Sequence, residues 1–309
     1  MALHPVYVKM LEAMRQAGRP QLSDGSPADA RALVAAGRAP LGRGPEVGAV
    51  SELSIATRAG SIPGRLFHPL DPASGLIVYV HGGGWVAGAL DDFDAMARTL
   101  VARSACALLL VDYRLAPEHP FPAGLEDTED AIRWAHAHCA ELAGREVPLV
   151  VAGDSAGGNM VAVAAMALKD QVPLALQLLF YPVTDADTDT PSYRAYGADY
   201  GLTQQDMVWF LRHYAGDHPV SDPRLAPLRS ADLSGAPATW LATAEYDVLR
   251  DEGEAFAARL SASGVAVEMR RYAGLAHGFA RMMNLVDTAD QALTDAAAAI
   301  SRAVSKKVA

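Results

Sequence analysis

The sequence predicts an α/β fold: an eight-stranded, mostly parallel, twisted sheet with helices on both faces. Three observations carry this prediction. The chain has 309 residues and is 51% hydrophobic, which is enough to bury a sizeable core. Apolar, β-rich runs alternate along the chain with helical patterns, as they do where parallel strands are joined by helices. The middle runs are continuously apolar, which is typical of strands buried on both faces.

Eight apolar runs are the expected strands. They span residues 50–57, 62–67, 76–80, 107–112, 149–153, 174–180, 239–244 and 265–272. The first two alternate between polar and apolar residues, and this pattern predicts an antiparallel hairpin at one edge of the sheet. The helical patterns between the later strands span residues 93–103, 124–138, 159–168, 251–262 and 288–304.

Two segments do not fit this alternation. Residues 1–45 contain an amphipathic helical pattern over 1–18 and then a linker rich in glycine and proline. Residues 185–220 contain a helical pattern over 203–214, for which Thr203 is the expected N-cap. Open α/β sheets bind ligands at the carboxyl ends of their strands, and we expect both segments there. The predicted division is therefore a two-part cap, 1–45 and 185–220, over a catalytic core of 46–184 and 221–309.

The composition excludes several classes of protein. The net charge of −10 argues against nucleic acid or an anionic membrane as the main partner. No apolar run approaches the length that spans a bilayer, and the N-terminus lacks a secretory pattern. Cys106 and Cys139 have no Cys or His partner at metal spacing, so we expect buried free thiols, no metal site and a cytoplasmic location.

The most informative motif is Gly-Asp-Ser-Ala-Gly at 153–157, which follows an apolar strand and opens a helical run. This context predicts a sharp turn with the Ser155 side chain at its apex. Gly153 and Gly157 lack the Cβ atoms that would clash as strand and helix close on that turn. The short pattern arises often by chance, so the rest of the chain must show whether Ser155 is a nucleophile or an ordinary turn residue.

A serine nucleophile needs a histidine base and an acid that orients it, here in the chain order serine, acid, histidine. Asp247 is the preferred acid because it lies in the loop after the strand 239–244. Asp251 is better explained as a helix cap or first-turn acid, Glu245 is a third option, and all three could be solvated. Of the nine histidines only His277 follows the last strand, between small residues and with Phe279 expected to pack beneath it.

A glycine run, His-Gly-Gly-Gly-Trp at 81–85, directly follows the strand 76–80. Three glycines let the backbone turn its N–H groups toward one point, where they would stabilise the oxyanion formed by attack on a carbonyl. Gly83 and Gly84 are the expected donors, with Ala156 as the third. We expect Gly82 to support the loop and His81 to brace it by hydrogen bonding. A flexible loop is the alternative reading of such a run.

Six apolar residues are candidates for the substrate pocket, although each could equally be ordinary core. They are Trp85, Leu202, Trp209, Phe210, Leu249 and Phe279. An aromatic, capped pocket favours short or medium acyl chains. Residues 113–123, with three prolines, read as a rigid loop bracing the site, where a cis peptide bond is a minority expectation. Asp154, beside the nucleophile, could orient the elbow or line the pocket.

Five motifs, in one order and within residues 50–285, give the chain a resemblance to a family. They are His-Gly-Gly-Gly-Trp at 81–85, Tyr-Arg-Leu-Ala-Pro-Glu at 113–118, Gly-Asp-Ser-Ala-Gly-Gly-Asn at 153–159, Asp247 followed by Leu-Arg-Asp-Glu-Gly at 249–253, and His-Gly-Phe at 277–279. Together they resemble the bacterial hormone-sensitive-lipase-like carboxylesterases of the α/β-hydrolase fold. One departure is Val248, where the family usually has proline.

The resemblance implies a serine carboxylesterase with the triad Ser155, Asp247 and His277, no cofactor and a two-part helical cap. It also implies a homodimer through the edge strand at 265–272. The expected reactants are a small-molecule ester and water, and the expected intermediate is an acyl-enzyme. An amidase, a lactonase or a carbohydrate deacetylase would need the same triad. A ligand-binding receptor on this scaffold would lack the catalytic histidine, so His277 argues against that alternative.

Overall fold

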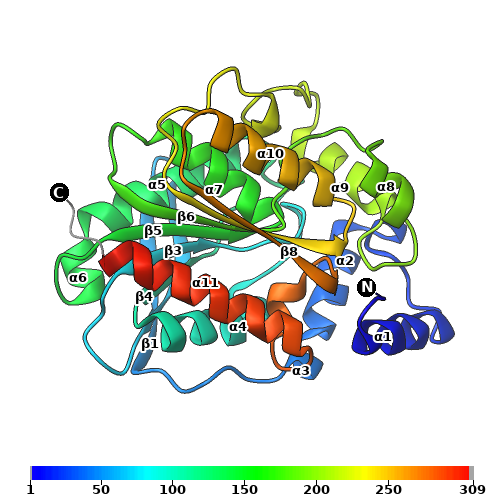
Figure 1. Cartoon of the computed structure of the whole chain (residues 1–309), viewed down its shortest axis with the longest axis horizontal. Coiled ribbons are helices and arrows are strands. Elements are labelled where there is room, and N and C mark those ends of the chain that lie inside the picture. Colours follow the sequence, from blue (N-terminus) through cyan, green and yellow to red (C-terminus); the bar gives the residue numbers. More distant parts are fainter. Residues whose placement is uncertain (1, 306–309) are drawn as a thin grey trace.

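A computed structural model of the chain describes residues 2–305, which form a central sheet between two layers of helices (Figure 1). The strands are β1 (Ala49–Thr57), β2 (Gly60–His68), β3 (Leu76–Val80), β4 (Ala107–Val111), β5 (Leu149–Asp154), β6 (Leu174–Phe180), β7 (Thr239–Tyr246) and β8 (Val267–Ala276). Their order across the sheet is β1-β2-β4-β3-β5-β6-β7-β8.

The pairing confirms the predicted sheet. β1 pairs with β2, and β2 with β4, in antiparallel register. All the other neighbours are parallel. The carboxyl ends of β3, β5, β7 and β8 therefore meet at one edge of the sheet, and each of the predicted functional loops begins there.

The helices lie on both faces of the sheet and at one end of it. They are α1 (Pro5–Gln16), α2 (Pro27–Ala36), α3 (Arg38–Leu41), α4 (Leu90–Ser104), α5 (Ala123–Ala137), α6 (Cys139–Ala143), α7 (Ala156–Ala167), α8 (Pro191–Tyr196), α9 (Gln204–Ala215), α10 (Arg250–Ala262) and α11 (Asp287–Ser305). Helices α5, α7 and α10 cover one face, and α4 and α11 cover the other (Figure 1). Short 3₁₀ turns are η1 (Leu22–Asp24), η2 (Pro227–Arg229) and η3 (Phe279–Arg281).

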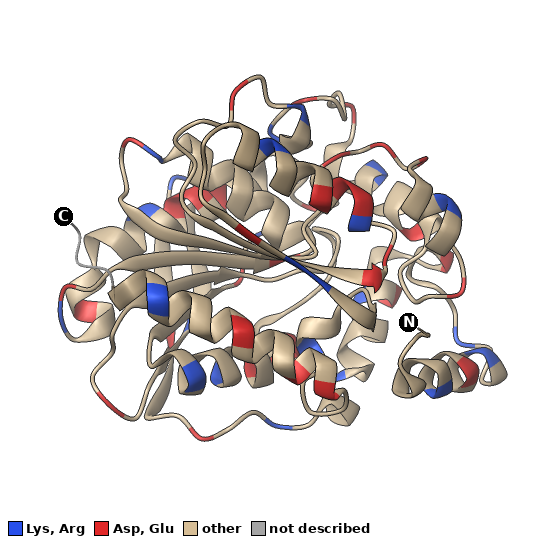
Figure 2. Ribbon diagram, viewed as in Figure 1, with Lys and Arg blue, Asp and Glu red and all other residues tan. Residues whose placement is uncertain are grey.

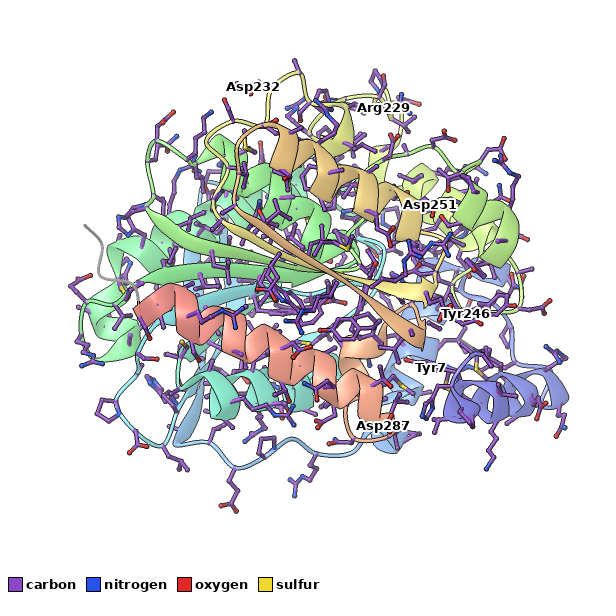
Figure 3. All side chains as sticks on the ribbon, viewed as in Figure 1. Tyr7, Arg229, Asp232, Tyr246, Asp251 and Asp287 are labelled. Carbon is purple, nitrogen blue, oxygen red and sulfur yellow. The ribbon has the colours of Figure 1, made fainter. Side chains whose placement is uncertain are left out.

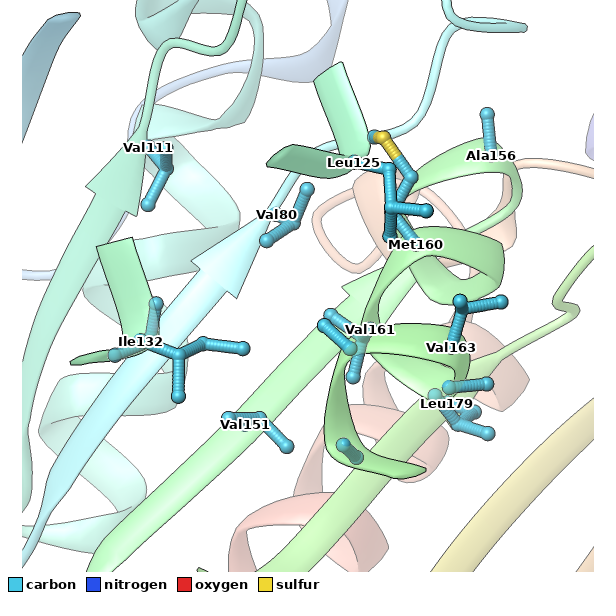
Figure 4. Close-up of a cluster of buried hydrophobic side chains, with 14 of the residues drawn as sticks. Val80, Val111, Leu125, Ile132, Val151, Ala156, Met160, Val161, Val163 and Leu179 are labelled. Carbon is cyan, nitrogen blue, oxygen red and sulfur yellow. The ribbon is translucent and has the colours of Figure 1, made fainter. Parts of the chain in front are cut away.

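The core has two parts because successive side chains of a strand point to opposite faces of the sheet. In β3, Val78 and Val80 pack in the cluster under α5 and α7, whereas Ile77 and Tyr79 pack in the cluster under α4 and α11. Figure 4 shows the first cluster, in which Val161 of α7 lies among the strand residues. This two-sided burial is why the middle strands are continuously apolar.

The linker expected after residue 18 is wrong in part, because it contains α2 and α3. A capping box starts α2: the Ser26 hydroxyl accepts from the Asp29 N–H, and the Asp29 carboxylate accepts from the Ser26 N–H. Pro27 at the first helical position has no N–H to lose. The sequence Ser-Pro-Ala-Asp at 26–29 is a helix start signal. The helix was not predicted because it is short and glycines and prolines lie on both sides of it.

The second unusual segment contains α8 and the predicted α9, which begins after its N-cap Thr203. This segment contacts the N-terminal one, since the Ser23 N–H donates to Asp206 Oδ1 at 2.9 Å. Both lie near the same end of the sheet (Figure 1). In the loop 113–123 the Ala116–Pro117 and Phe121–Pro122 bonds are both cis, which the sequence offered only as the minority expectation.

Residues of both charge signs are distributed around the ribbon in Figure 2. Cys106 and Cys139 are buried free thiols, as predicted. Within residues 2–305, no helix is long and apolar enough to cross a membrane. No group of three His, Cys, Asp or Glu side chains in this part of the chain could hold a metal ion.

Candidate active site

Ser155 lies at a strained turn between β5 and α7. Its backbone has φ 53° and ψ −121°, a region that residues with a side chain rarely adopt. The turn closes only with glycine on each side. A Cβ on Gly157 would lie 2.0 Å from the Val80 carbonyl oxygen, and one on Gly153 would lie 2.6 Å from the Gly157 carbonyl carbon. The structure therefore forms the elbow that the motif predicts.

Three side chains from three strand ends form one hydrogen-bonded chain. His277, after β8, places Nε2 3.0 Å from Ser155 Oγ. Its Nδ1 lies 2.8 Å from Asp247 Oδ2 in the loop after β7. A neutral imidazole satisfies both contacts when Nδ1–H donates to the carboxylate and Nε2 accepts from the hydroxyl. The sheet thus brings together the three residues that the chain order predicts.

The Asp247 carboxylate is held in place from its other side. It is almost fully buried, and its Oδ1 accepts the Leu249 N–H at 3.0 Å. The Val248 carbonyl accepts from Ser192 Oγ of α8 at 2.6 Å. The loop is therefore fixed by hydrogen bonds although valine replaces the proline usual in the family.

The two other candidate acids have different partners. Asp251, labelled in Figure 3, lies in the first turn of α10, and its Oδ2 accepts the Ser192 N–H at 2.8 Å. Glu245 Oε2 accepts the Gly274 N–H at 2.8 Å. Each acid therefore fixes a neighbouring segment of backbone, and Asp247 is the one that contacts His277.

The ring that packs against His277 comes from Tyr181, which the sequence analysis did not single out. The two ring centroids are 4.7 Å apart. Tyr181 directly follows β6 with φ 36°, and its hydroxyl accepts the Ala280 N–H at 3.2 Å. Phe279, expected beneath His277, lies instead behind Tyr181 at 4.8 Å in the α4–α11 cluster. The sequence signal that could have identified Tyr181 was its place as an aromatic residue at the end of a central strand.

The glycine loop after β3 has the backbone that the motif predicts. Gly83 and Gly84 have φ 121° and 60°, and a Cβ on either would lie within about 2 Å of its neighbours, 2.1 Å from the Ala87 carbonyl oxygen and 2.2 Å from the Phe210 ring, respectively. Neither N–H donates to an acceptor within the described residues. The Ala156 N–H opens α7, where the first N–H groups of a helix have no intrahelical partner.

Asp154 connects the glycine loop to the elbow. Its Oδ1 accepts the Gly82 N–H and the Tyr79 hydroxyl, both at 2.9 Å. The side chain is buried, and burial raises the pKa of this carboxyl above its ordinary value. Asp154 therefore supports the loop, which the sequence alone left undecided.

His81 is fully buried and braces the same loop. Its Nδ1 lies 2.8 Å from the Gly82 carbonyl oxygen, to which Nδ1–H donates. The ring stacks between Phe93 and Tyr113, with centroids 5.1 and 4.5 Å away. Burial lowers the His81 pKa to about 4, so the ring is neutral near pH 7.

The pocket candidates separate into two groups. Phe210 of α9 lies over Gly84, and the half-buried Trp209 packs on Phe210 with centroids 5.3 Å apart. Leu202 is half buried against the same core cluster. Trp85 stacks on Tyr214 at 4.5 Å, and Trp85 and Leu249 are buried in the same core cluster that contains the buried Phe210.

The N-terminal segment contacts the site's loops directly. The Arg31 guanidinium of α2 donates to the carbonyls of Val86 at 2.8 Å and Ala116 at 3.0 Å. It also pairs with both carboxylate oxygens of Glu118. Tyr7 of α1, labelled in Figure 3, is buried. The His4 N–H donates to the Gly274 carbonyl oxygen of β8 at 2.9 Å.

Known proteins agree with this architecture. A family model described as the alpha/beta hydrolase fold matches residues 77–281. The chain is 42% identical over 249 residues to a carboxylic ester hydrolase, LipN, of Mycobacterium tuberculosis, a match that covers 76% of this chain and 65% of that relative. It is 36% identical over 314 residues to an ethyl acetate hydrolase of Pseudomonas putida, covering 95% and 96% of the two chains.

A solved structure is similar over almost the whole chain. It is an ester hydrolase from the metagenome of Lake Arreo, complexed with a bipyridine phosphonate derivative. The TM-score is 0.93 at 35% identity, and the match covers 98% of this chain and all of that one. The chain therefore belongs to the hormone-sensitive-lipase-like carboxylesterase family of the α/β-hydrolase fold.

Proposed function

We propose that the protein is a serine carboxylesterase that hydrolyses short- to medium-chain acyl esters through an acyl-enzyme intermediate. The observation that carries the proposal is the continuous chain from Ser155 Oγ through His277 to Asp247, with contacts of 3.0 and 2.8 Å. A hydroxyl, a base and a buried orienting acid in this arrangement make a weak nucleophile reactive.

In the first half-reaction, His277 Nε2 takes the proton of Ser155 as Oγ forms a bond to the ester carbonyl carbon. The oxyanion lies against the N–H groups of Gly83, Gly84 and Ala156, each worth roughly 10²–10³ in rate. His277 then gives its proton to the alcohol oxygen as the carbon–oxygen bond breaks. Water repeats the sequence on the acyl-enzyme and releases the carboxylic acid.

Two buried acidic residues, Asp247 and Asp154, support the reacting groups. Asp247 keeps the Nδ1 proton on the imidazole and stabilises the ring while it is charged. Burial raises the pKa of Asp154 above its ordinary value, and the hydrogen bonds that this carboxyl accepts from Tyr79 and Gly82 act in the opposite direction. The main task of Asp154 is to hold Gly82 and therefore the oxyanion loop.

The residues that lie over the glycine loop 81–85 limit the size of the substrate. Residues 1–45 and 185–220 act as a cap, and Phe210 limits the space over Gly84. This restricts the acyl or alcohol group that fits. The similarity over nearly the full chain to a protein named for ethyl acetate supports a small ester. We expect activity to fall from butyrate to palmitate esters.

The test is turnover of p-nitrophenyl acetate by the wild type and by Ser155→Ala. Loss of turnover together with loss of fluorophosphonate labelling is the expected result, and undiminished turnover in the variant would refute the proposal. A matched pair of ester and amide substrates separates an esterase from an amidase. A series of acyl chains from acetate to palmitate tests the length limit.

Two further expectations belong to this proposal. The two buried free thiols support a reducing, cytoplasmic location. Among the described residues, β8 is the last strand of the sheet and pairs with β7 alone, and its Met269 is exposed, which supports a homodimer formed through this edge. Sedimentation of the purified protein measures its oligomeric state and so tests for the homodimer.

A further inference from the structure

Ser192, the second residue of α8, lies beside the loop that carries the acid of the triad. It is fully buried, and its hydroxyl donates to the Val248 carbonyl oxygen at 2.6 Å. We propose that Ser192 is a positioning residue for the triad, because it orients the peptide group that holds the Asp247 carboxylate. This inference rests on the proposed esterase function, since it assigns a role at the same site.

The peptide group between Val248 and Leu249 carries both contacts. Its carbonyl oxygen accepts from the Ser192 hydroxyl, and its N–H, which belongs to Leu249, donates to Asp247 Oδ1 at 3.0 Å. A peptide group is planar, so its C=O and its N–H cannot turn independently. Ser192 therefore sets the direction of the N–H that fixes the carboxylate.

The same contacts continue to the nucleophile. Asp247 Oδ2 lies 2.8 Å from His277 Nδ1, and His277 Nε2 lies 3.0 Å from Ser155 Oγ. The Ser192 hydroxyl is thus the far end of a continuous chain of hydrogen bonds. Each bond in such a chain polarises the next one, so a carbonyl that accepts makes its own N–H a stronger donor. Loss of the hydroxyl should therefore weaken the hold on Asp247.

The start of α8 holds Ser192 in place. The helix begins after its N-cap Thr190, whose hydroxyl accepts the Tyr193 N–H at 3.4 Å. The Ser192 N–H has no partner within its own helix, as is usual in a first turn, and donates to Asp251 Oδ2 at 2.8 Å. Ser192 Oγ also lies 3.0 Å from Thr190 Oγ1. The hydroxyl is therefore fixed from both α8 and α10, as a positioning group must be.

Solvent does not reach this part of the acid loop. Asp247 is 1% exposed, and Val248 and Ser192 are fully buried. Bulk water therefore cannot replace the hydroxyl at the Val248 carbonyl, and its removal should be felt by the carboxylate. Because Ser192 acts from behind the acid, its loss should lower kcat and leave KM nearly unchanged.

The first measurement is the downfield proton resonance of His277 Nδ1–H, assigned by its absence in His277→Gln. It reports the contact with Asp247 and needs no substrate. The second measurement is kcat and KM for p-nitrophenyl acetate. The variants are Ser192→Ala and Ser192→Cys, which keeps the size of the side chain but is a weak donor. The matched control is Thr128→Val of α5, which removes a buried hydroxyl that donates to the Gly124 carbonyl at 2.9 Å.

In Ser192→Ala we expect the resonance to move or to be lost by exchange, and kcat to fall about tenfold with KM within about twofold of the wild type. Ser192→Cys should lie between the two, and it decides the question if the alanine variant does not fold. Thr128→Val should match the wild type in both measurements.

Three results would overturn the inference: a Ser192 variant that keeps both the wild-type resonance and the wild-type kcat, a loss confined to KM, or an equal loss of kcat in Thr128→Val. Failure of the proposed function has a different signature. In that case the wild type does not turn over the ester, whereas the resonance still shows whether Ser192 orients the acid.

Discussion

Asp154 Oδ1, one residue before the nucleophile, accepts the N–H of Gly82 at the head of the glycine loop, 2.9 Å away. The same oxygen accepts the Tyr79 hydroxyl at 2.9 Å. One carboxylate oxygen thus fixes the distance between the serine turn and the loop whose N–H groups would hold the oxyanion. This contact explains why an acid stands beside the serine.

Asp154→Ala should therefore lower both activity and stability. Two buried donors lose their acceptor, at about 1–3 kcal/mol each, and the loop is released. We expect kcat to fall by roughly 10²-fold and KM to change less, as measured with p-nitrophenyl acetate. Asp154→Asn is the control, because an amide oxygen can still accept both bonds. If the asparagine variant loses as much as the alanine variant, the charge matters and the hydrogen bonds do not.

Asp247→Asn should lower kcat by about 10⁴-fold without loss of fold, since an amide cannot hold the imidazole in the tautomer that accepts the serine proton. Asp251→Asn provides the comparison, because Asp251 binds the Ser192 N–H and not the histidine. Its kcat should remain within about threefold of the wild type. An equal loss of kcat in the two variants would contradict the assignment of Asp247 as the acid of the triad.

The buried His81 predicts a pH dependence of stability. Its pKa is lowered to about 4 in the folded protein, against an ordinary value of 6.5. The unfolded chain therefore binds a proton between these values that the folded protein does not, and stability falls as the pH drops from 6.5 to 4. The loss from this group is about 3 kcal/mol, since one pKa unit is worth 1.36 kcal/mol.

Urea denaturation at several pH values between 4 and 7 measures this effect. His81→Gln should flatten the acid side of the curve even if it lowers stability overall, whereas His136→Gln, an exposed position on α5, should leave the slope unchanged. If the free energy of unfolding falls equally with decreasing pH in the wild type and in His81→Gln, other groups cause the loss of stability at low pH.

The features that the sequence predicted well are those encoded by adjacent residues. The elbow at 153–157 and the glycine run at 81–85 each have a local physical cause, a close backbone approach, that only glycine permits. Asp247 and His277 could be predicted because parallel strands place their carboxyl ends at one edge. Tyr181 and Arg31 were missed, since each acts through a contact with residues distant in the chain, and neither lies in a motif with a known spacing.

Arg31 links the N-terminal segment to the site. Its guanidinium donates to the Val86 carbonyl, directly after the oxyanion loop, and to the Ala116 carbonyl within the loop 113–123. Arg31→Ala should lower kcat by roughly tenfold, because small displacements of positioning groups are costly. Arg19→Ala, which removes a bond only to Leu33 of the same segment, should have little effect. Equal activity in Arg31→Ala and wild type would show that the loops hold their positions without this contact.

Phe210 should set the size of the group accepted over the glycine loop. The space above Gly84 is so small that a Cβ there would lie 2.2 Å from the Phe210 ring, and Gly84 has φ 60°, so Gly84→Ala should be almost inactive. Phe210→Ala removes the ring and should raise kcat/KM for octanoate relative to acetate esters by about tenfold. It should also lower the melting temperature, because a buried aromatic ring contributes about 3–5 kcal/mol.

The double variant separates the two causes of the Gly84→Ala defect. If the clash with the ring dominates, adding Phe210→Ala restores part of the activity. If backbone strain at φ 60° dominates, the double variant stays as inactive as Gly84→Ala, because alanine at that angle moves the N–H groups whatever lies above it. Since the ring contact is much shorter than van der Waals distance, we expect partial recovery. An unchanged chain-length preference in Phe210→Ala would show that another residue limits the acyl group.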